Sequence, residues 1–285
     1  MNASRWSLVA ASLLGLAGFT WPLLAAALPE EAQAAVPIVA LALVPAVVIA
    51  VAVSLDRQVH TATTIALLGV LAAVGAAVRI AGTGVGGVEA VFIVLILAGR
   101  AYGARFGFLL GMLTIALSSV LWGGIGPWTP FQIFACGWVA AGAGLLPRLR
   151  GRWEIVLLVG YGIIASYLFG LLMNLWFWPF AVGAGTGLSY ESGGPLGQNL
   201  ASFGLYSLVT STLTWDTVRA ITTTAGILLF GPAALAALRR AKVGRARKLT
   251  PRSTGPRGDG TRTRQSTARG AAAAPPTAPP PSARA

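Results

Sequence analysis

Long apolar runs dominate the chain, and short polar or glycine- and proline-containing breaks separate them. A helix needs about 20 mostly apolar residues to cross about 30 Å of hydrocarbon. The candidate runs are Trp6–Leu28, Val36–Leu55, Thr61–Val78, Ala90–Gly99, Phe106–Leu146, Ile155–Phe180, the less apolar stretch 200–214, and a last run ending near Leu238. The run that begins at Phe106 is too long for one span, and "WGGIGPWTPF" divides it into two. The pattern predicts an all-α, polytopic membrane protein.

Composition agrees with a lipid environment. The 285 residues are 55% hydrophobic and only 10% charged, with a mean hydropathy of +0.74. Soluble domains carry about 25% charged residues, so this chain has too few to cover a water-soluble surface. Of its 21 Lys and Arg, 12 lie from Arg239 onward. The excess positive charge therefore belongs mainly to a tail, and we expect no nucleic-acid partner.

Charges in the connections between runs predict the orientation. Basic residues fall in alternate connections: Arg57, then Arg100 and Arg105, then Arg148, Arg150 and Arg152, then Arg239–Lys248. The other connections carry Glu30, Glu31, Glu89 and Glu191. By the positive-inside rule, the tail is cytoplasmic and the loop 181–199 faces outward. Arg79 and Arg219 break the alternation, and both are expected at span ends. We expect a multi-pass protein of the cell membrane.

Three parts are expected along the chain. Residues 1–60 form an N-terminal hydrophobic hairpin, whose first run reads either as an uncleaved span or, with Arg5 and the small-residue "AQA" at 33–35, as a signal peptide. Residues 61–240 form the membrane core. Residues 241–285 are basic, Pro/Ala-rich and without apolar periodicity, which predicts a disordered tail. This tail is either a solvated anchor or a site for anionic lipid headgroups.

The residues needed for catalysis are scattered or scarce. The eight carboxylates form no pair placed for acid–base work, and the chain has neither a Walker loop nor a GxGxxG turn. His60 and Cys136 are the only residues of their types, which leaves no metal-binding pattern. We expect His60 in a loop and Cys136 in a packed interior. The sequence predicts a protein that is not an enzyme and that holds no cofactor or metal.

Several polar residues near apolar runs are open to two interpretations. Asp216 and Arg219, at i and i+3 at the mouth of the last span, form either a local ion pair or a group that orients a ligand. Arg79 and Glu89 flank the glycine-rich segment 82–87, where they either close a loop as an ion pair or take part in binding. Asn174 is either a hydrogen bond between helices or a ligand contact.

The tryptophans and the small residues raise the same kind of question. Trp128, Trp138, Trp176 and Trp178 suit either an interfacial belt or the wall of a ligand site. Two overlapping AxxxA patterns, Ala72–Ala76 and Ala73–Ala77, and the GxxxG pair Gly107–Gly111 allow close helix approach. That approach serves either packing within this chain or, for the alanines, docking of a partner.

The core resembles the substrate-binding S components of energy-coupling factor (ECF) vitamin transporters. The resemblance covers residues from about 61 to 240 and rests on the alanine-rich first core helix and three stretches in order. These are "GTGVGGVEAVFIVLILAGRAYGARFGFLLGMLTIALSSVL", "GGIGPWTPFQIFACGWVAAGAGLLP" and "TWDTVRAITTTAGILLFGPAAL". Within them, "GPWTPFQ" and "WDxxR" are the more specific elements. The two N-terminal runs and the arginine-rich tail depart from the minimal family pattern.

The resemblance implies a six-helix binding subunit preceded by two extra spans. Such a subunit works with a transmembrane T component and two ATPases, so ATP is used by partner chains. The family's AxxxA face docks the T component, which carries over to Ala72, Ala73, Ala76 and Ala77. Its ligand site in the outer half of the bundle carries over to Gly84, Glu89, Trp128, Gln132, Asn174, Trp215, Asp216 and Arg219.

The resulting expectation is a subunit that binds a vitamin-like small molecule from outside. General similarity favours a corrinoid, cobalamin or a precursor. The alternatives from other classes are a membrane scaffold or assembly subunit without a ligand, and a membrane enzyme, which the missing catalytic groups disfavour.

Overall fold

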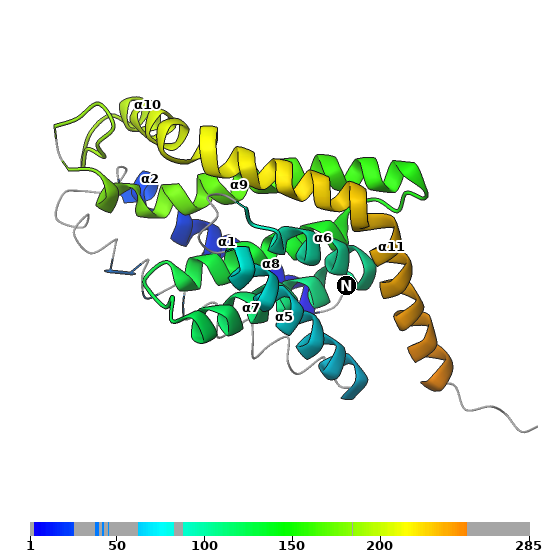
Figure 1. The fold of residues 1–285 in the computed structure, drawn as a ribbon. Helices are drawn as coiled ribbons and strands as arrows, with labels where there is room; N and C mark the ends of the chain where they lie inside the picture. Colours follow the sequence, from blue (N-terminus) through cyan, green and yellow to red (C-terminus); the bar gives the residue numbers. More distant parts are fainter. Residues whose placement is uncertain are drawn as a thin grey trace, which may run out of the picture. The chain divides into compact units, whose positions relative to one another are not determined.

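The computed structural model describes residues 3–25, 38, 39, 42, 45, 62–82, 88–183 and 185–249. These residues form helices and no strand, which confirms the all-α prediction for this part of the chain. The helices are α1 (Ala3–Phe19), α2 (Trp21–Ala25), α5 (Ala62–Gly82), α6 (Val91–Tyr102), α7 (Ala104–Trp122), α8 (Thr129–Leu145), α9 (Arg152–Ala181), α10 (Leu196–Ser207), the π-helix η1 (Leu208–Asp216) and α11 (Thr217–Leu249) (Figure 1).

Four of these helical segments are long and apolar enough to cross a membrane. They are Ala62–Gly82, Ala104–Trp122, Arg152–Ala181 and the continuous stretch Leu196–Ala241. Large apolar side chains also cover outward faces, among them Val70 at 61% exposure and Leu229 at 73%. Lipid accommodates such side chains, whereas a water-facing surface of this kind is unusual. The fold is that of a helical protein embedded in a membrane.

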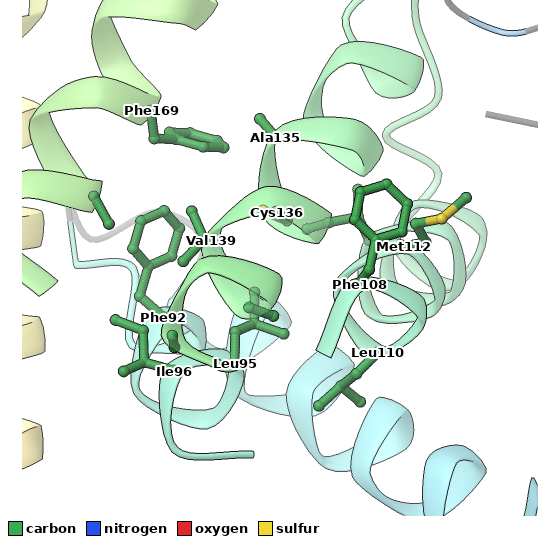
Figure 2. Close-up of a cluster of buried hydrophobic side chains, with 14 of the residues drawn as sticks. Phe92, Leu95, Ile96, Phe108, Leu110, Met112, Ala135, Cys136, Val139 and Phe169 are labelled. Atoms are coloured by element: carbon green, nitrogen blue, oxygen red, sulfur yellow. The ribbon is translucent and has the colours of Figure 1, made fainter. Parts of the chain in front are cut away.

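The short helix α6 lies at the centre of the core. Phe92, Leu95 and Ile96 of α6 are completely buried and pack toward α8 and α9, where Cys136 and Phe169 lie (Figure 2). α6 also contacts α5, α7 and α11. A helix of 12 residues is too short to span the hydrocarbon alone. Its neighbours enclose it. Glu89, just before α6, and Arg100, near its end, therefore lie next to side chains of other helices.

Glycines allow α7 and α8 to pack backbone against backbone. A Cβ on Gly107 would collide with the carbonyl of Ala140, and one on Gly111 with the carbonyl of Cys136. The predicted GxxxG pair therefore packs within this chain. Cys136 is a free, buried cysteine, as expected.

The two AxxxA patterns of α5 face different surroundings. Ala72 and Ala76 are 3% and 1% exposed and belong to the interior face, where α5 packs on α7 and α6. Ala73 and Ala77 are exposed. Since one helical step separates the two pairs by about 100°, only the second pair is accessible to a partner. Ala72 and Ala76 therefore pack within this chain, and docking of a partner on α5 stays a prediction.

The N-terminal helices share the core of residues 62–241. Phe19 is completely buried, and its ring lies 5.1 Å from that of Phe131 and 5.5 Å from that of Trp138. Trp21 donates its indole N–H to the carbonyl of Trp176 at 3.0 Å. Residues 3–25 thus pack as part of the bundle. The predicted second span, Val36–Leu55, falls almost wholly outside the described residues, and so do His60 and the tail from Thr250.

The last helix differs from its prediction. α10, η1 and α11 run on as one helical stretch, Leu196–Ala241 of 46 residues, and α11 continues to Leu249. Asp216 and Arg219 therefore lie inside a helix and not at its mouth. No glycine or proline occurs between Leu205 and Ala225, so nothing in the local sequence stops the helix before the two charges. Instead, the helix widens into η1 at this point.

Candidate binding site

Arg219 is the centre of an ionic cluster in the apolar bundle. Its Nε donates to Oε2 of Glu89 at 2.7 Å, and its Nη2 to Oε1 at 3.2 Å. Its Nη1 donates to Oδ1 of Asp216 at 2.6 Å and to the carbonyl of Ser166 at 3.1 Å. We call Glu89, Asp216 and Arg219 the Arg219 cluster. Its members come from two places in the sequence, Glu89 and the pair Asp216–Arg219, and each nitrogen of the guanidinium has an acceptor.

The π-helix η1 sets the position of Asp216, its last residue. In a π-helix each backbone N–H bonds to the carbonyl five residues earlier, so each turn contains an extra residue and the side chains change direction. Such turns are frequent at functional sites. The side chains repeat this spacing: Ser211 Oγ donates to Oδ2 of Asp216 at 2.8 Å, and Thr217 Oγ1 donates to the carbonyl of Thr212 at 2.8 Å. Ser211, one of the polar residues that make 200–214 only moderately apolar, thus helps to hold this carboxylate.

Gly170 and two phenylalanines shape the rest of the cluster. A Cβ at Gly170 would collide with the carboxylate of Asp216, so α9 makes room for the charge by having a glycine there. The guanidinium carbon of Arg219 lies 4.8 Å from the ring centre of Phe169 and 5.6 Å from that of Phe92. The two rings meet edge to face at 5.2 Å and lie near each other in Figure 2. They exclude water from one side of the guanidinium and stabilise its charge.

The Arg219 cluster carries one more negative than positive charge. The side chains of Asp216 and Arg219 are only 1% and 6% exposed, but that of Glu89 is 37% exposed. Glu89 is therefore the member of the cluster that is most accessible from outside it. The ion pair of Asp216 with Arg219, one of the two interpretations of their spacing, is present in the structure. The alternative pairing of Glu89 with Arg79 is wrong, because Glu89 binds Arg219.

Arg79 binds two neutral groups instead. Its Nη1 donates to Ser118 Oγ at 2.9 Å, and its Nη2 to Oε1 of Gln132 at 3.0 Å. Gln132 was a predicted site residue, whereas the Arg79–Ser118 contact was missed.

Among the described residues, Asn174, Trp128 and Trp215 form no hydrogen bond with the Arg219 cluster. Asn174 donates to Ser207 Oγ at 3.0 Å, a contact between α9 and α10, as its packing interpretation predicts. Trp128 and Trp215 are 43% and 51% exposed, so neither ring is enclosed in the bundle. Gly84 lies outside the described residues.

The remaining tryptophans pack in the interior. Trp176 stacks on Phe131 at 4.2 Å with an interplanar angle of 6°. Trp178 is completely buried and donates to the carbonyl of Leu188 at 2.7 Å. Trp138 donates to Ser12 Oγ of α1 at 3.0 Å. The contacts of Trp176 and Trp178 hold α9 to α8 and to the loop after α9, and the contact of Trp138 joins α8 to α1.

A second ionic cluster, absent from the sequence-based prediction, centres on Glu154. Its Oε1 accepts from Arg100 Nε and from Arg239 Nη2, both at 2.6 Å. Arg100 also donates to the carbonyls of Leu146 and Pro147 at 2.8 and 2.9 Å. We call Arg100, Glu154 and Arg239 the Glu154 cluster. The signal was a lone acidic residue in the basic run "PRLRGRWE".

The described residues include no group of three or more His, Cys, Asp or Glu side chains that could hold a metal ion. The arrangement offers instead charged hydrogen-bonding groups beside aromatic rings, which suits recognition of a polar ligand. Comparisons with protein-family models, curated proteins and solved structures gave no match to this chain.

Proposed function

We propose that this chain is the substrate-binding subunit of a membrane importer of the ECF type and binds a small polar nutrient from outside. The observation that supports this most is the Arg219 cluster. Ionisable residues inside a membrane bundle cost several kcal/mol each and usually mark a functional site. Here three of them meet, and the one with the most exposed side chain, Glu89, offers a carboxylate to a ligand.

In this proposal the ligand binds at Glu89, and Arg219 and Asp216 hold that carboxylate in place. A donor group of the ligand, a hydroxyl, amide or amine, hydrogen-bonds to Glu89. The rings of Phe92 and Phe169 pack against the guanidinium and restrict its movement. A corrinoid remains the proposed substrate on the grounds of the resemblance alone.

Energy comes from partner chains in this proposal. A T component docks on the exposed alanines Ala73 and Ala77, and two cytoplasmic ATPases hydrolyse ATP. Ala72 and Ala76 support the docking helix from inside. The protein has the six-helix core of the family, spans the cell membrane several times and keeps its basic tail in the cytoplasm.

A membrane scaffold is the second candidate, and one observation favours it. Each guanidinium nitrogen of Arg219 has an acceptor within the chain. Such a satisfied cluster can fix the arrangement of α6, α9 and α11 without any ligand.

Mass spectrometry of small molecules released from the purified full-length protein tests the proposal. We expect a specific molecule from the wild type, a T component and two ATPases in the same preparation, and loss of the molecule in Asp216→Asn. Ala73→Leu should retain the molecule and lose the partners. A wild-type preparation without a bound molecule that still assembles with other membrane proteins, and loses them in Ala73→Leu, supports the scaffold instead.

A further inference from the structure

Arg79 differs from the other arginines that reach into the bundle. Arg219 pairs with Glu89 and Asp216, and Arg100 pairs with Glu154. Arg79 forms no ion pair with any residue that the structure describes. A guanidinium that is partly removed from water and lacks a counter-charge is costly, so its position needs an explanation.

The hydrogen bonds of Arg79 leave part of its guanidinium available. A guanidinium has five N–H donors in one plane. Ser118 Oγ and Gln132 Oε1 take one donor each, and both are neutral acceptors. The other three donors have no acceptor among the described residues. Such a planar fork matches the two oxygens of a carboxylate or phosphate.

The helix α7 adds buried hydroxyls next to Arg79's partner. Ser119 follows Ser118 directly, and Thr114 precedes it by about one turn, opposite Gly75 of α5. Both are almost completely buried, and their hydroxyl oxygens have no hydrogen-bond partner within the described ranges. At Thr114 and Ser118, the interface between α5 and α7 therefore contains hydroxyl groups near Arg79.

The position of Arg79 makes it accessible from one side of the membrane. Arg79 lies in the last turn of α5, Ser118 near the end of α7, and Gln132 near the start of α8. These ends belong to the side on which Glu89 precedes α6, which the charge distribution predicts to be the outer side. Arg79 itself is partly exposed.

We propose that Arg79, oriented by Ser118 and Gln132, binds an oxyanion group, a carboxylate or a phosphate, at the outer ends of α5, α7 and α8. The group belongs either to a soluble small molecule or to a lipid headgroup. This site goes beyond the proposed function, because it requires neither the Arg219 cluster nor a transporter partner.

Thermal unfolding of the full-length protein in detergent tests the site with inorganic phosphate as the probe. Phosphate replaces chloride at constant ionic strength, so that general screening stays the same. We expect phosphate to raise the Tm of the wild type and of Arg240→Gln, a control that removes an exposed arginine. Arg79→Gln should not respond to phosphate.

Gln132→Glu keeps the test decisive if Arg79→Gln fails to fold. The new carboxylate has nearly the shape of the amide and pairs with Arg79 from within the chain. We expect this variant to melt above the wild type and to lose its response to phosphate, because the internal carboxylate competes with the added oxyanion.

Nanodiscs distinguish the two sources of the oxyanion. If a headgroup is the ligand, phosphatidylglycerol stabilises the wild type relative to phosphatidylcholine alone, free phosphate has little effect, and Gln132→Glu loses the lipid effect. The proposal is overturned if the wild type responds to neither probe, or if the wild type, Arg79→Gln and Gln132→Glu respond equally. Asp216→Asn separates this proposal from the proposed function, since it should lose the copurified molecule while keeping the phosphate response.

Discussion

The Arg219 cluster and the Glu154 cluster have the same arrangement of three side chains, but the signs of their charges are reversed. In each, a buried central residue binds one buried and one more exposed partner of opposite sign. The central side chains, Arg219 and Glu154, are 6% and 5% exposed. Their buried partners, Asp216 and Arg100, are 1% and 5% exposed, and the other two, Glu89 and Arg239, are 37% and 47% exposed.

The difference between the clusters lies in the charge that is left over. The Arg219 cluster has an extra carboxylate, and the Glu154 cluster has an extra guanidinium. The more exposed partner in each cluster has the sign of the excess, negative at Glu89 and positive at Arg239. The excess positive charge of the Glu154 cluster fits the predicted cytoplasmic side, because basic residues are enriched there. The rule gives no reason for a partly exposed carboxylate at Glu89, which is why we propose binding at the Arg219 cluster.

Removing the central arginine should have the largest effect on stability. Arg219→Leu leaves Asp216 buried without a counter-charge, and breaking a buried pair in this way costs about 3–5 kcal/mol. We expect little folded protein in size-exclusion chromatography and a strongly lowered Tm. Arg219→Lys keeps a positive charge but loses the fork of hydrogen bonds, so it should retain more folded protein. If the leucine variant melts like the wild type, the cluster has no structural role.

The matching change in the second cluster should cost less. In Glu154→Gln, Arg100 keeps its bonds to the carbonyls of Leu146 and Pro147, and Arg239 is exposed enough to be hydrated. We expect a loss of about 2 kcal/mol, the range of a hydrogen bond to a charged group. Thermal unfolding measures this loss. Glu191→Gln, which changes an exposed glutamate, is the control. A loss equal to that of Arg219→Leu would contradict the difference between the clusters.

A methyl group at Gly170 should disturb the Arg219 cluster alone. Gly170→Ala forces the carboxylate of Asp216 to move, and overpacking of this kind costs about 1–3 kcal/mol. Gly160→Ala in the same helix is the matched control, since nothing lies within 4 Å of its added Cβ. We expect the control to melt at or slightly above the wild type. Equal melting temperatures for the two variants would show that Asp216 is not held against α9.

Local patterns in the sequence predicted the helices and one contact of the candidate site. Run lengths and breaks located α5 to α9, and the spacing of Asp216 and Arg219 predicted their pairing. The depth of that pair was not predictable in the same way. The absence of glycine and proline before the charges permits a continuous helix, but it does not show where in the bundle the charges lie. That position depends on the packing against α9 and on the widened turn of η1.

The sequence did not predict ion pairs between residues that are far apart along the chain. Glu89 is close to Arg79 along the chain, so a local rule favoured that pair, but it lies against Arg219, 130 positions away. Glu154 likewise binds Arg239, 85 positions away. The faces of α5 depended on its neighbours too, because the AxxxA spacing alone does not show which alanine pair is buried.

The exposed partners should show the smallest change in stability and the clearest difference in function. Glu89→Gln and Arg239→Gln each remove a partly hydrated charge, so both should cost no more than about 1 kcal/mol. Glu89→Gln should nevertheless lose the molecule that copurifies with the wild type, because the ligand is proposed to bind that carboxylate. Arg239→Gln should retain it. Equal ligand recovery from both variants, measured by mass spectrometry at matched protein amounts, would remove the functional distinction between the clusters and leave both as structural ion pairs.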